Sequence, residues 1–328
     1  MRLSAIGLIL TLALGFLVAP LCSNAQQPVK RIGILWPGSP PSEAQRQQSP
    51  FLQKLRELGW HEGHNLAFER RFAEGKLDRL PDLAAELVRL RPDIIITGGT
   101  PGVRAAQQAT TTIPIVSNGA GMLVEQGIVA SLAHPGGNLT GVEGNSAGLH
   151  GKRLEFLKDA VPQLARVAFL YNPANPFFTF ELPSVETDAR ALGVQLQPVA
   201  VRHADEFETA FATIVEQRPD ALFIAHDGLF DFHFRQIVDF ATTHRLPTMS
   251  GWSGIAKAGG LMAYGFSNRE ISQRAAVYVD KILKGARPGD LPIERIMKFE
   301  LVINLKTAEA LGITFPPALL MLADEVIR

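Results

Sequence analysis

The tripeptide Arg-Pro-Asp occurs twice in the chain and introduces the same pattern each time. In RPDIIITGGTPG (91–102) and in RPDALFIAHDG (218–228), an apolar run follows the aspartate and ends in a polar, glycine-bearing turn. Three further pairs match in the same order: Arg31–Pro37 with Arg166–Pro173, Leu58–Gly59 with Leu192–Gly193, and Ile113–Val116 with Leu246–Met249. The matched segments lie 127 to 135 residues apart. We therefore expect two halves built to one plan.

Each half alternates short apolar runs with longer amphipathic stretches, which is typical of βαβ units and a parallel sheet. Strands are expected near 31–36, 65–72, 93–97, 114–117 and 139–143, then near 166–171, 194–199, 220–225, 247–249 and 261–264. Helices are expected near 43–58, 79–90, 101–109 and 122–132, then near 151–160, 178–191, 204–217, 229–243 and 253–258. A tail beyond the repeat should add a helix near 268–284, a strand near 298–304 and a short terminal helix.

The pattern predicts an α/β protein of two Rossmann-like parallel-sheet lobes joined by a multi-strand hinge. The N-terminal lobe is assigned residues 26–143 plus about 265–290, and the C-terminal lobe residues 144–264 plus about 291–328. The crossings between lobes are expected in glycine- and proline-bearing segments near 141–145, 265–267 and 289–292. Open sheets of this kind bind ligands at the carboxyl ends of their strands, so two sets of strand ends would face each other across a cleft.

Residues 1–25 have the features of a secretory signal peptide, which implies a periplasmic protein. An uncharged run of fifteen residues, Ala5–Ala19, precedes the small-residue site Ser23–Ala25. The run is shorter than the roughly 20 residues of a membrane-spanning helix. Leu21 is not the small residue usual before a lipoprotein cysteine, so we expect cleavage without lipidation. Cleavage also removes Cys22, the only cysteine, which excludes thiol catalysis and thiolate metal sites in the mature chain.

Composition and motifs argue against several classes of function. The formal net charge is zero, so neither nucleic acid nor an anionic membrane is expected as a partner. The sequence contains no dinucleotide-binding fingerprint, no P-loop lysine, no nucleophile elbow and no zinc-protease motif. His61 and His64 share a glycine-bearing loop without further ligands nearby, which indicates solvated histidines. No metal, no cofactor and no enzymatic activity are therefore expected.

The candidate ligand site consists of residues that follow the predicted strands. They are Trp36, Ser39, Gly99, Thr100 and Asn118 in the first half and Tyr171, Asn172, Asn175, Asp227 and Trp252 in the second. These groups stack and form hydrogen bonds, as ligand-binding residues do. The three aromatic rings either cover an apolar ligand body or pack in the core.

Two of these positions allow a plain structural interpretation beside the functional one. Asp227 ends an apolar strand, so it either caps a helix or pairs with a ligand ammonium group. Gly98–Pro101 is either a simple turn into a helix or a site for an anionic group at the helix start. In the binding interpretation, Ser39, Thr100 and Asn118 face the anionic or carbonyl end of the ligand.

Five ordered segments resemble a known family. They are VASLAHPGGNLTGV (129–142), ARVAFLYNPANP (165–176), GKRLEFLKDAVP (151–162), YVDKILKGARPGDLPIE (278–294) and KFELVINLKTAEALGI (298–313). The chain resembles, from Lys30 onward, the ABC transporter substrate-binding proteins of the tryptophan/tyrosine-binding type, with the type I periplasmic binding protein fold.

The resemblance implies an extracytoplasmic solute-binding component of an ABC importer. Such a receptor captures a small solute, expected to be an amino acid or a related amphipathic molecule, in the interlobe cleft by hinge closure. Its partners would be a membrane permease and an ATPase, and it would act as a monomer. The chain departs from the family pattern at Ser117–Glu125 and at Trp252–Ser253, which puts the ligand in doubt. The alternatives are a secreted two-domain α/β enzyme and a ligand-presenting subunit of a sensor.

Overall fold

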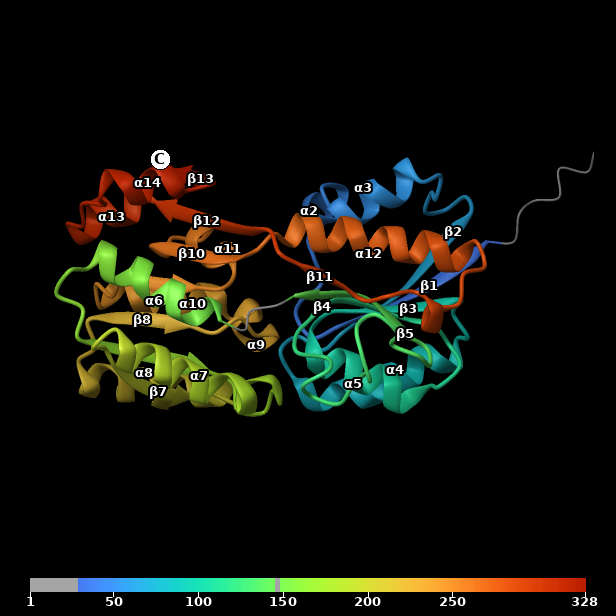
Figure 1. The fold of residues 1–328 in the computed structure, drawn as a ribbon, viewed down its shortest axis with the longest axis horizontal. Coiled ribbons are helices and arrows are strands. Elements are labelled where there is room, and N and C mark those ends of the chain that lie inside the picture. Colours follow the sequence, from blue (N-terminus) through green and yellow to red (C-terminus); the bar gives the residue numbers. More distant parts are fainter. Residues whose placement is uncertain (1–28, 145–147) are drawn as a thin grey trace, which may run out of the picture.

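A computed structural model describes residues 29–144 and 148–328, and this part of the chain forms two lobes around two sheets (Figure 1). The first sheet is parallel throughout, in the order β11-β5-β4-β3-β1-β2. Its strands are β1 (Lys30–Trp36), β2 (Leu66–Phe72), β3 (Ile94–Thr97), β4 (Ile115–Ala120), β5 (Leu139–Gly144) and β11 (Glu294–Ile296). The predicted signal peptide, residues 1–25, lies outside the described residues.

The second sheet has the order β13-β12-β10-β9-β8-β6-β7 and is parallel except for the pair β10 and β12. Its strands are β6 (Arg166–Tyr171), β7 (Gln195–Ala200), β8 (Ala221–Ile224), β9 (Thr248–Ser250), β10 (Met262–Phe266), β12 (Phe299–Asn304) and β13 (Glu325–Ile327). The order β5-β4-β3-β1-β2 of the first sheet recurs as β10-β9-β8-β6-β7. The predicted α/β fold of two mostly parallel sheets is confirmed.

The repeated Arg-Pro-Asp motif joins the third strand of each sheet to the first. Asp93 Oδ2 accepts a hydrogen bond of 2.8 Å from the backbone N–H of Arg31, at the start of β1. Asp220 Oδ2 accepts the equivalent bond, also 2.8 Å, from the N–H of Arg166 at the start of β6. Each aspartate also donates its own N–H to the carbonyl of the same arginine. The motif therefore sets where neighbouring strands begin in both halves.

Helices cover both faces of the first sheet. On one face lie α3 (Pro50–Glu57) and α12 (Asn268–Leu283), and on the other lie α4 (Leu80–Arg89) and α5 (Gly99–Ala109). A short helix, α2 (Glu43–Gln47), precedes α3. Because α12 packs on α3, β4 and β5, a helix from the tail of the sequence belongs to the core of the first lobe (Figure 1).

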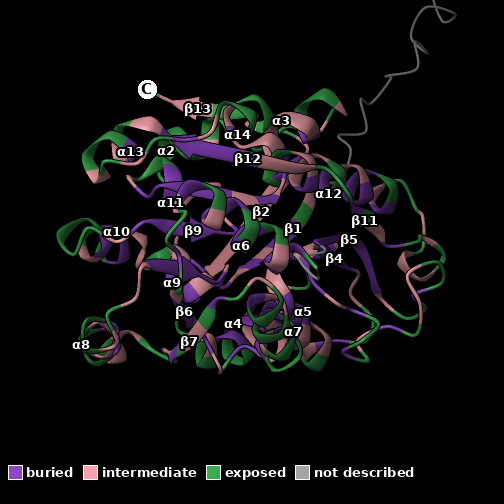
Figure 2. Cartoon of the chain, turned by 60° about the vertical axis from the view of Figure 1, so that its left-hand side comes forward, coloured by how far each residue is buried: buried purple, intermediate pink, exposed green. Residues whose placement is uncertain are grey.

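The second lobe holds the remaining helices around one continuous core. They are α6 (Leu149–Ala160), α7 (Phe177–Ala191), α8 (Phe207–Gln217), α9 (Gly228–Phe232), α10 (Phe234–Thr243), α11 (Ser253–Lys257), α13 (Leu305–Leu311) and α14 (Pro317–Leu322). Strand residues such as Phe169 and Phe223 are fully buried, and the exposed residues of the helices lie on their outer sides (Figure 2). Among the described helices, none has the length and apolar character that crossing a membrane requires.

The chain passes between the lobes after β5, after β10 and between β11 and β12. The third crossing had been expected near 289–292, and this prediction is wrong. The hydroxyl of Thr140 in β5 donates to the carbonyl of Leu291 at 2.8 Å, and Glu294 then pairs with Val142. This segment therefore still runs along the first lobe, and the chain crosses at Met297–Lys298.

Three predicted helices differ from the structure: the one expected over 229–243 is divided at His233 into α9 and α10, and two others differ for local reasons. No helix forms over 122–132, where Met122 and Gly127 have positive φ angles of 52° and 66° and turns replace it. The helix expected over 43–58 is divided because Ser49 caps α3 and Pro50 occupies its first turn. The three-residue strands β11 and β13 had not been predicted.

Candidate ligand-binding site

Trp36 ends β1, and its indole lies over the backbone of Gly98 at the end of β3. A Cβ atom at Gly98 would lie 2.6 Å from the indole Cη2, so the ring needs a glycine at this position. Gly99, the first residue of α5, has a φ of 68°. Ser39 is half-buried in the loop that follows Trp36. The first-lobe candidates Trp36, Ser39 and Gly99 thus occur at the carboxyl ends of neighbouring strands β1 and β3.

The Thr100 hydroxyl has hydrogen-bond partners among the described residues, whereas the side-chain oxygen of Asn118 has none. The buried Thr100 hydroxyl donates to the carbonyl of Gly121 at 3.3 Å and accepts from Nε2 of Gln126 at 3.4 Å. Its side chain is therefore occupied within the lobe. Asn118 Oδ1 is also buried, but no hydrogen-bond donor within residues 29–144 and 148–328 reaches it. A buried acceptor without a partner is uncommon in folded proteins, so Asn118 can accept a ligand N–H.

In the second lobe, Asp227 gathers two of the predicted site residues around its carboxylate. Oδ1 accepts from Nδ2 of Asn172 at 3.0 Å and from the N–H of Leu229 at 2.9 Å, and Oδ2 accepts from Nδ2 of Asn175 at 2.8 Å. Asp227 is 3% exposed and is the N-cap of α9. Burial raises the pKa of this carboxyl above its ordinary value, and the three hydrogen bonds oppose the shift.

Trp252 forms an aromatic wall with two residues that had not been proposed for the site. The imidazole of His226 lies parallel to the Trp252 indole, at 6.5 Å between centroids and an interplanar angle of 4°. The ring of Phe266 lies 5.7 Å from His226. We refer to His226, Trp252 and Phe266 as the aromatic wall. His226 lies two residues after β8, so its position was the signal in the sequence, but its neighbours come from distant segments.

Tyr171 belongs to the core of the second lobe. Its ring stacks on Phe169 at 5.8 Å with an interplanar angle of 2°, and meets Phe178 edge-on at 6.3 Å. The structure therefore does not bring Tyr171 together with the aromatic wall through any ring contact among the described residues.

His226 carries the main electrostatic interaction of the aromatic wall. Its Nε2 lies 3.3 Å from Oδ2 of Asp231 in α9, and 30% of the imidazole side chain is exposed. Burial favours the neutral ring, but the Asp231 carboxylate outweighs this effect and raises the pKa of His226 above its ordinary value. The imidazole is thus an ionisable group that remains accessible at the strand ends.

Helix α9 brings the strand ends of the two lobes together (Figure 1). A Cβ atom at Gly228, its first residue, would lie 2.9 Å from Pro37 Cβ in the loop after β1. A second contact joins the lobes at Gly121, where a Cβ would lie 2.8 Å from Cε2 of Phe177. Segments that follow β1, β4, β6 and β8 therefore meet at the junction.

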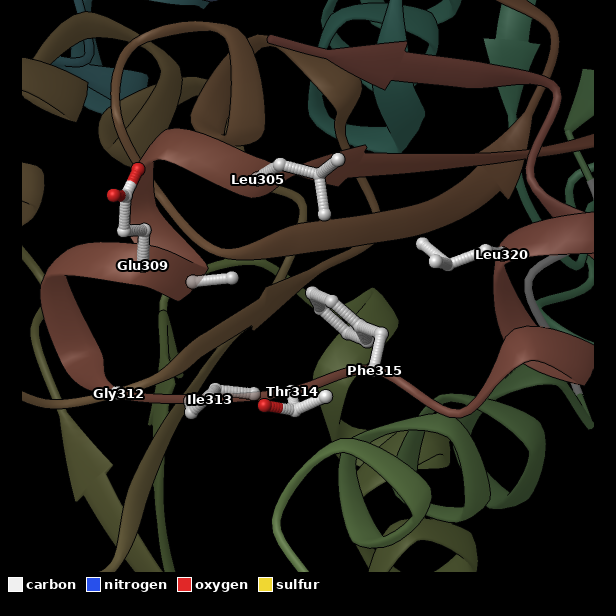
Figure 3. A pocket seen from close by; sticks show the side chains of 8 residues that line it. Leu305, Glu309, Gly312, Ile313, Thr314, Phe315 and Leu320 are labelled. Atoms are coloured by element: carbon white, nitrogen blue, oxygen red, sulfur yellow. The ribbon is translucent and has the colours of Figure 1, made fainter.

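A separate open pocket of about 530 Å³ lies in the tail of the second lobe (Figure 3). Leu305, Ala308, Glu309, Gly312, Ile313, Thr314, Phe315 and Leu320 line it. None of the candidate residues at the strand ends contributes to this pocket. Within the described residues, no group of three or more histidine, cysteine or carboxylate side chains is arranged to hold a metal ion.

Comparison with known proteins gives one consistent result. The family model described as ABC transporter substrate binding protein matches residues 31–327. A tyrosine-binding protein from Clostridioides difficile is 25% identical over 282 residues, which cover 86% of this chain and 81% of the relative.

Two solved structures extend the comparison to the fold. A conserved domain protein from Vibrio cholerae has a TM-score of 0.83 at 27% identity. An ABC domain from Streptococcus pneumonia, solved in complex with L-Trp, has a TM-score of 0.82 at 23% identity. Each comparison covers 91% of this chain and 99% of the other.

Proposed function

The chain belongs to the family of ABC transporter substrate-binding proteins, and from this premise we propose that it captures an aromatic amino acid, or a closely related amphipathic solute, for an ABC importer. The observation that carries the choice of ligand is the aromatic wall of His226, Trp252 and Phe266. It adjoins the first lobe, because a Cβ atom at Gly144 in β5 would lie 2.9 Å from Cε1 of Phe266. Relatives named for tyrosine binding or solved with L-Trp support the same class of solute.

Polar groups on both lobes suit the two charged ends of an amino acid. Asn118 Oδ1 is a buried acceptor without a described partner, and Asp227 Oδ2 has one described donor, so both are available to a ligand ammonium group. For Asn118 this replaces the contact with the anionic end of the ligand that was expected from the sequence. The start of α5 at Gly99 and Thr100 favours the carboxylate through its backbone N–H groups, and Ser39 belongs to the loop after β1, whose Pro37 approaches Gly99. Asp227 would then combine helix capping with ligand binding.

Closure of the lobes on the solute is the proposed mechanism. The crossings after β5, after β10 and at Met297–Lys298 form the hinge, and the contacts of Gly228 with Pro37 and of Gly121 with Phe177 belong to the closed form. A ligand that contacts both lobes stabilises the closed form more than the open one, and only such a difference in affinity can move the hinge.

Binding and closure are tested together on ligand-stripped protein. A thermal-shift screen of amino acids should give hits for L-tryptophan or L-tyrosine, because a ligand at one hundred times its Kd adds about 2.7 kcal/mol to the free energy of unfolding. Solution X-ray scattering should then show a smaller radius of gyration with the hit than without it. A hit that is chemically converted during incubation, or that binds without compaction, would contradict the transport proposal and favour the enzyme alternative.

We further propose that residues 1–25 direct export and that the mature chain works in the periplasm with a membrane permease and an ATPase. The small-residue site Ser23–Ala25 supports cleavage before Gln26. The intact mass of protein recovered from the periplasm should correspond to residues 26–328, with or without cyclisation of Gln26. A diacylglycerol adduct on Cys22 would show that the chain is a lipoprotein instead.

A further inference from the structure

We infer that His226, paired with Asp231 beside Trp252, is the group of the second lobe that recognises the carboxylate of the ligand, so that binding requires a protonated imidazole. This inference rests on the proposed function and adds a charged contact to it. In the closed form the carboxylate would lie between the start of α5 in the first lobe and His226 in the second.

The position of His226 suits a ligand contact better than a structural one. The side chain is 30% exposed, whereas its neighbours Asp227 and Ala225 are almost fully buried. Its ring is held on one side by Trp252 and on another by Phe266, at the strand ends where the lobes meet. The aromatic wall therefore fixes the direction of the imidazole without covering it.

Asp231 determines which nitrogen is available to a ligand. Because Nε2 lies 3.3 Å from the Asp231 carboxylate, we assign the retained proton to Nε2 and the titrating position to Nδ1. A protonated Nδ1 donates a hydrogen bond to a carboxylate. An unprotonated Nδ1 presents a lone pair, which repels a carboxylate. The charge state of His226 thus decides whether an acidic ligand is accepted.

Three charged side chains, together with burial, determine the charge state of His226. Burial lowers the pKa of His226, and so does Arg153 in α6. Asp231 in α9 and Asp227, just before α9, raise the pKa. Arg153 is itself buried, and its Nε donates to the carbonyl of Tyr264 at 2.7 Å. Burial lowers the pKa of Arg153 to about 10, so its charge is constant over the range in which His226 titrates. The two aspartates outweigh the opposing effects, so the pKa of His226 is raised.

The inference is tested by titration calorimetry from about pH 5.5 to about pH 8.5, the range in which histidine titrates. The probes are L-tryptophan, L-tyrosine, indole-3-propionate, which lacks the amine, and tryptamine, which lacks the carboxylate. We expect the affinity for the three acids to fall about tenfold per pH unit above the pKa of His226. The affinity for tryptamine should not fall in this way.

Substitutions test whether the pH dependence of binding arises from His226. His226→Gln should bind the acids more weakly and without the pH dependence, and Asp231→Asn should move the fall to lower pH. His244→Gln, at an exposed position in the same lobe, is the matched control and should behave as wild type. The imidazole resonances of His226, followed by NMR without ligand, should give a raised pKa that drops in Asp231→Asn.

The possible results distinguish failure of the role inferred for His226 from failure of the proposed function. Binding of the acids that is independent of pH, or a His226→Gln variant that keeps the pH dependence, overturns the role of His226 and leaves the proposed function standing. No binding of any probe at any pH overturns both.

Discussion

Asp227 shows how one carboxylate can fix the geometry of a whole strand end. It accepts hydrogen bonds from two asparagine side chains and from the first turn of α9, and all of these groups are buried or nearly so. Removing the carboxylate would leave several buried donors without an acceptor, which costs more than the loss of one ordinary hydrogen bond. At the scale of the residue, the ligand contact proposed for Asp227 therefore involves a group that also stabilises the fold.

Asp227→Ala should lower the free energy of unfolding by about 2–3 kcal/mol, because the cap of α9 and the acceptor for Asn172 and Asn175 are lost together. Chemical denaturation measures this change. The matched control is Asp239→Ala, an exposed aspartate on α10, which should have little effect. If Asp227→Ala keeps wild-type affinity for the identified amino acid, the proposed contact with the ligand ammonium group is wrong.

The sequence predicted which residues follow the strands, but not which of their side chains contact one another. Asn172, Asn175 and Asp227 were all proposed, because each follows a strand of a parallel sheet. That they share one hydrogen-bonded group depends on the spatial order of β6 and β8, which no local pattern shows. Of the aromatic wall, only Trp252 was proposed from the sequence, for the same reason: His226, Trp252 and Phe266 come from three separate segments.

At the scale of elements, α9 is short but occupies the position where the lobes touch. Gly228 begins the helix, and the absence of a side chain there lets Pro37 approach. Most strands followed from the alternation of apolar residues. The exceptions were short or broken elements, such as β11 and the segment 122–132, where tertiary pairing and positive φ angles decide the conformation.

Gly228→Ala should weaken ligand binding while the lobes remain folded, because the new Cβ would lie 2.9 Å from Pro37 Cβ and would obstruct the closed form. The matched control is Gly38→Ala, the same chemical change in the facing loop, where the nearest atom would lie at an ordinary 3.5 Å. Scattering with ligand should show less compaction for Gly228→Ala than for Gly38→Ala. Equal compaction of both variants would contradict the closing contact.

At the scale of the whole molecule, the repeat predicted two halves built to one plan, and the two sheets share the same order of five strands. The tail beyond the repeat matches no segment of the first half, so a comparison of the two halves could not predict its path. It adds α12 and β11 to the first lobe before it adds β12 and β13 to the second. The short strand β11 and the helix α12 both pack on first-lobe elements that lie far away in the sequence, and such distant contacts decided the location of the third crossing.

The return of β11 to the first sheet has a consequence for how the chain is made. Arg295 Nε donates to the fully buried Glu143 Oε2 at 2.6 Å, across 152 positions of sequence. While a ribosome is still producing the second half, Glu143 has no Arg295, and the apolar face that α12 later covers is open to water. A domain whose last strand arrives so late cannot finish folding during translation in the usual N-terminal-first order. The nascent first half should therefore remain a substrate for holding chaperones until residue 296 has emerged.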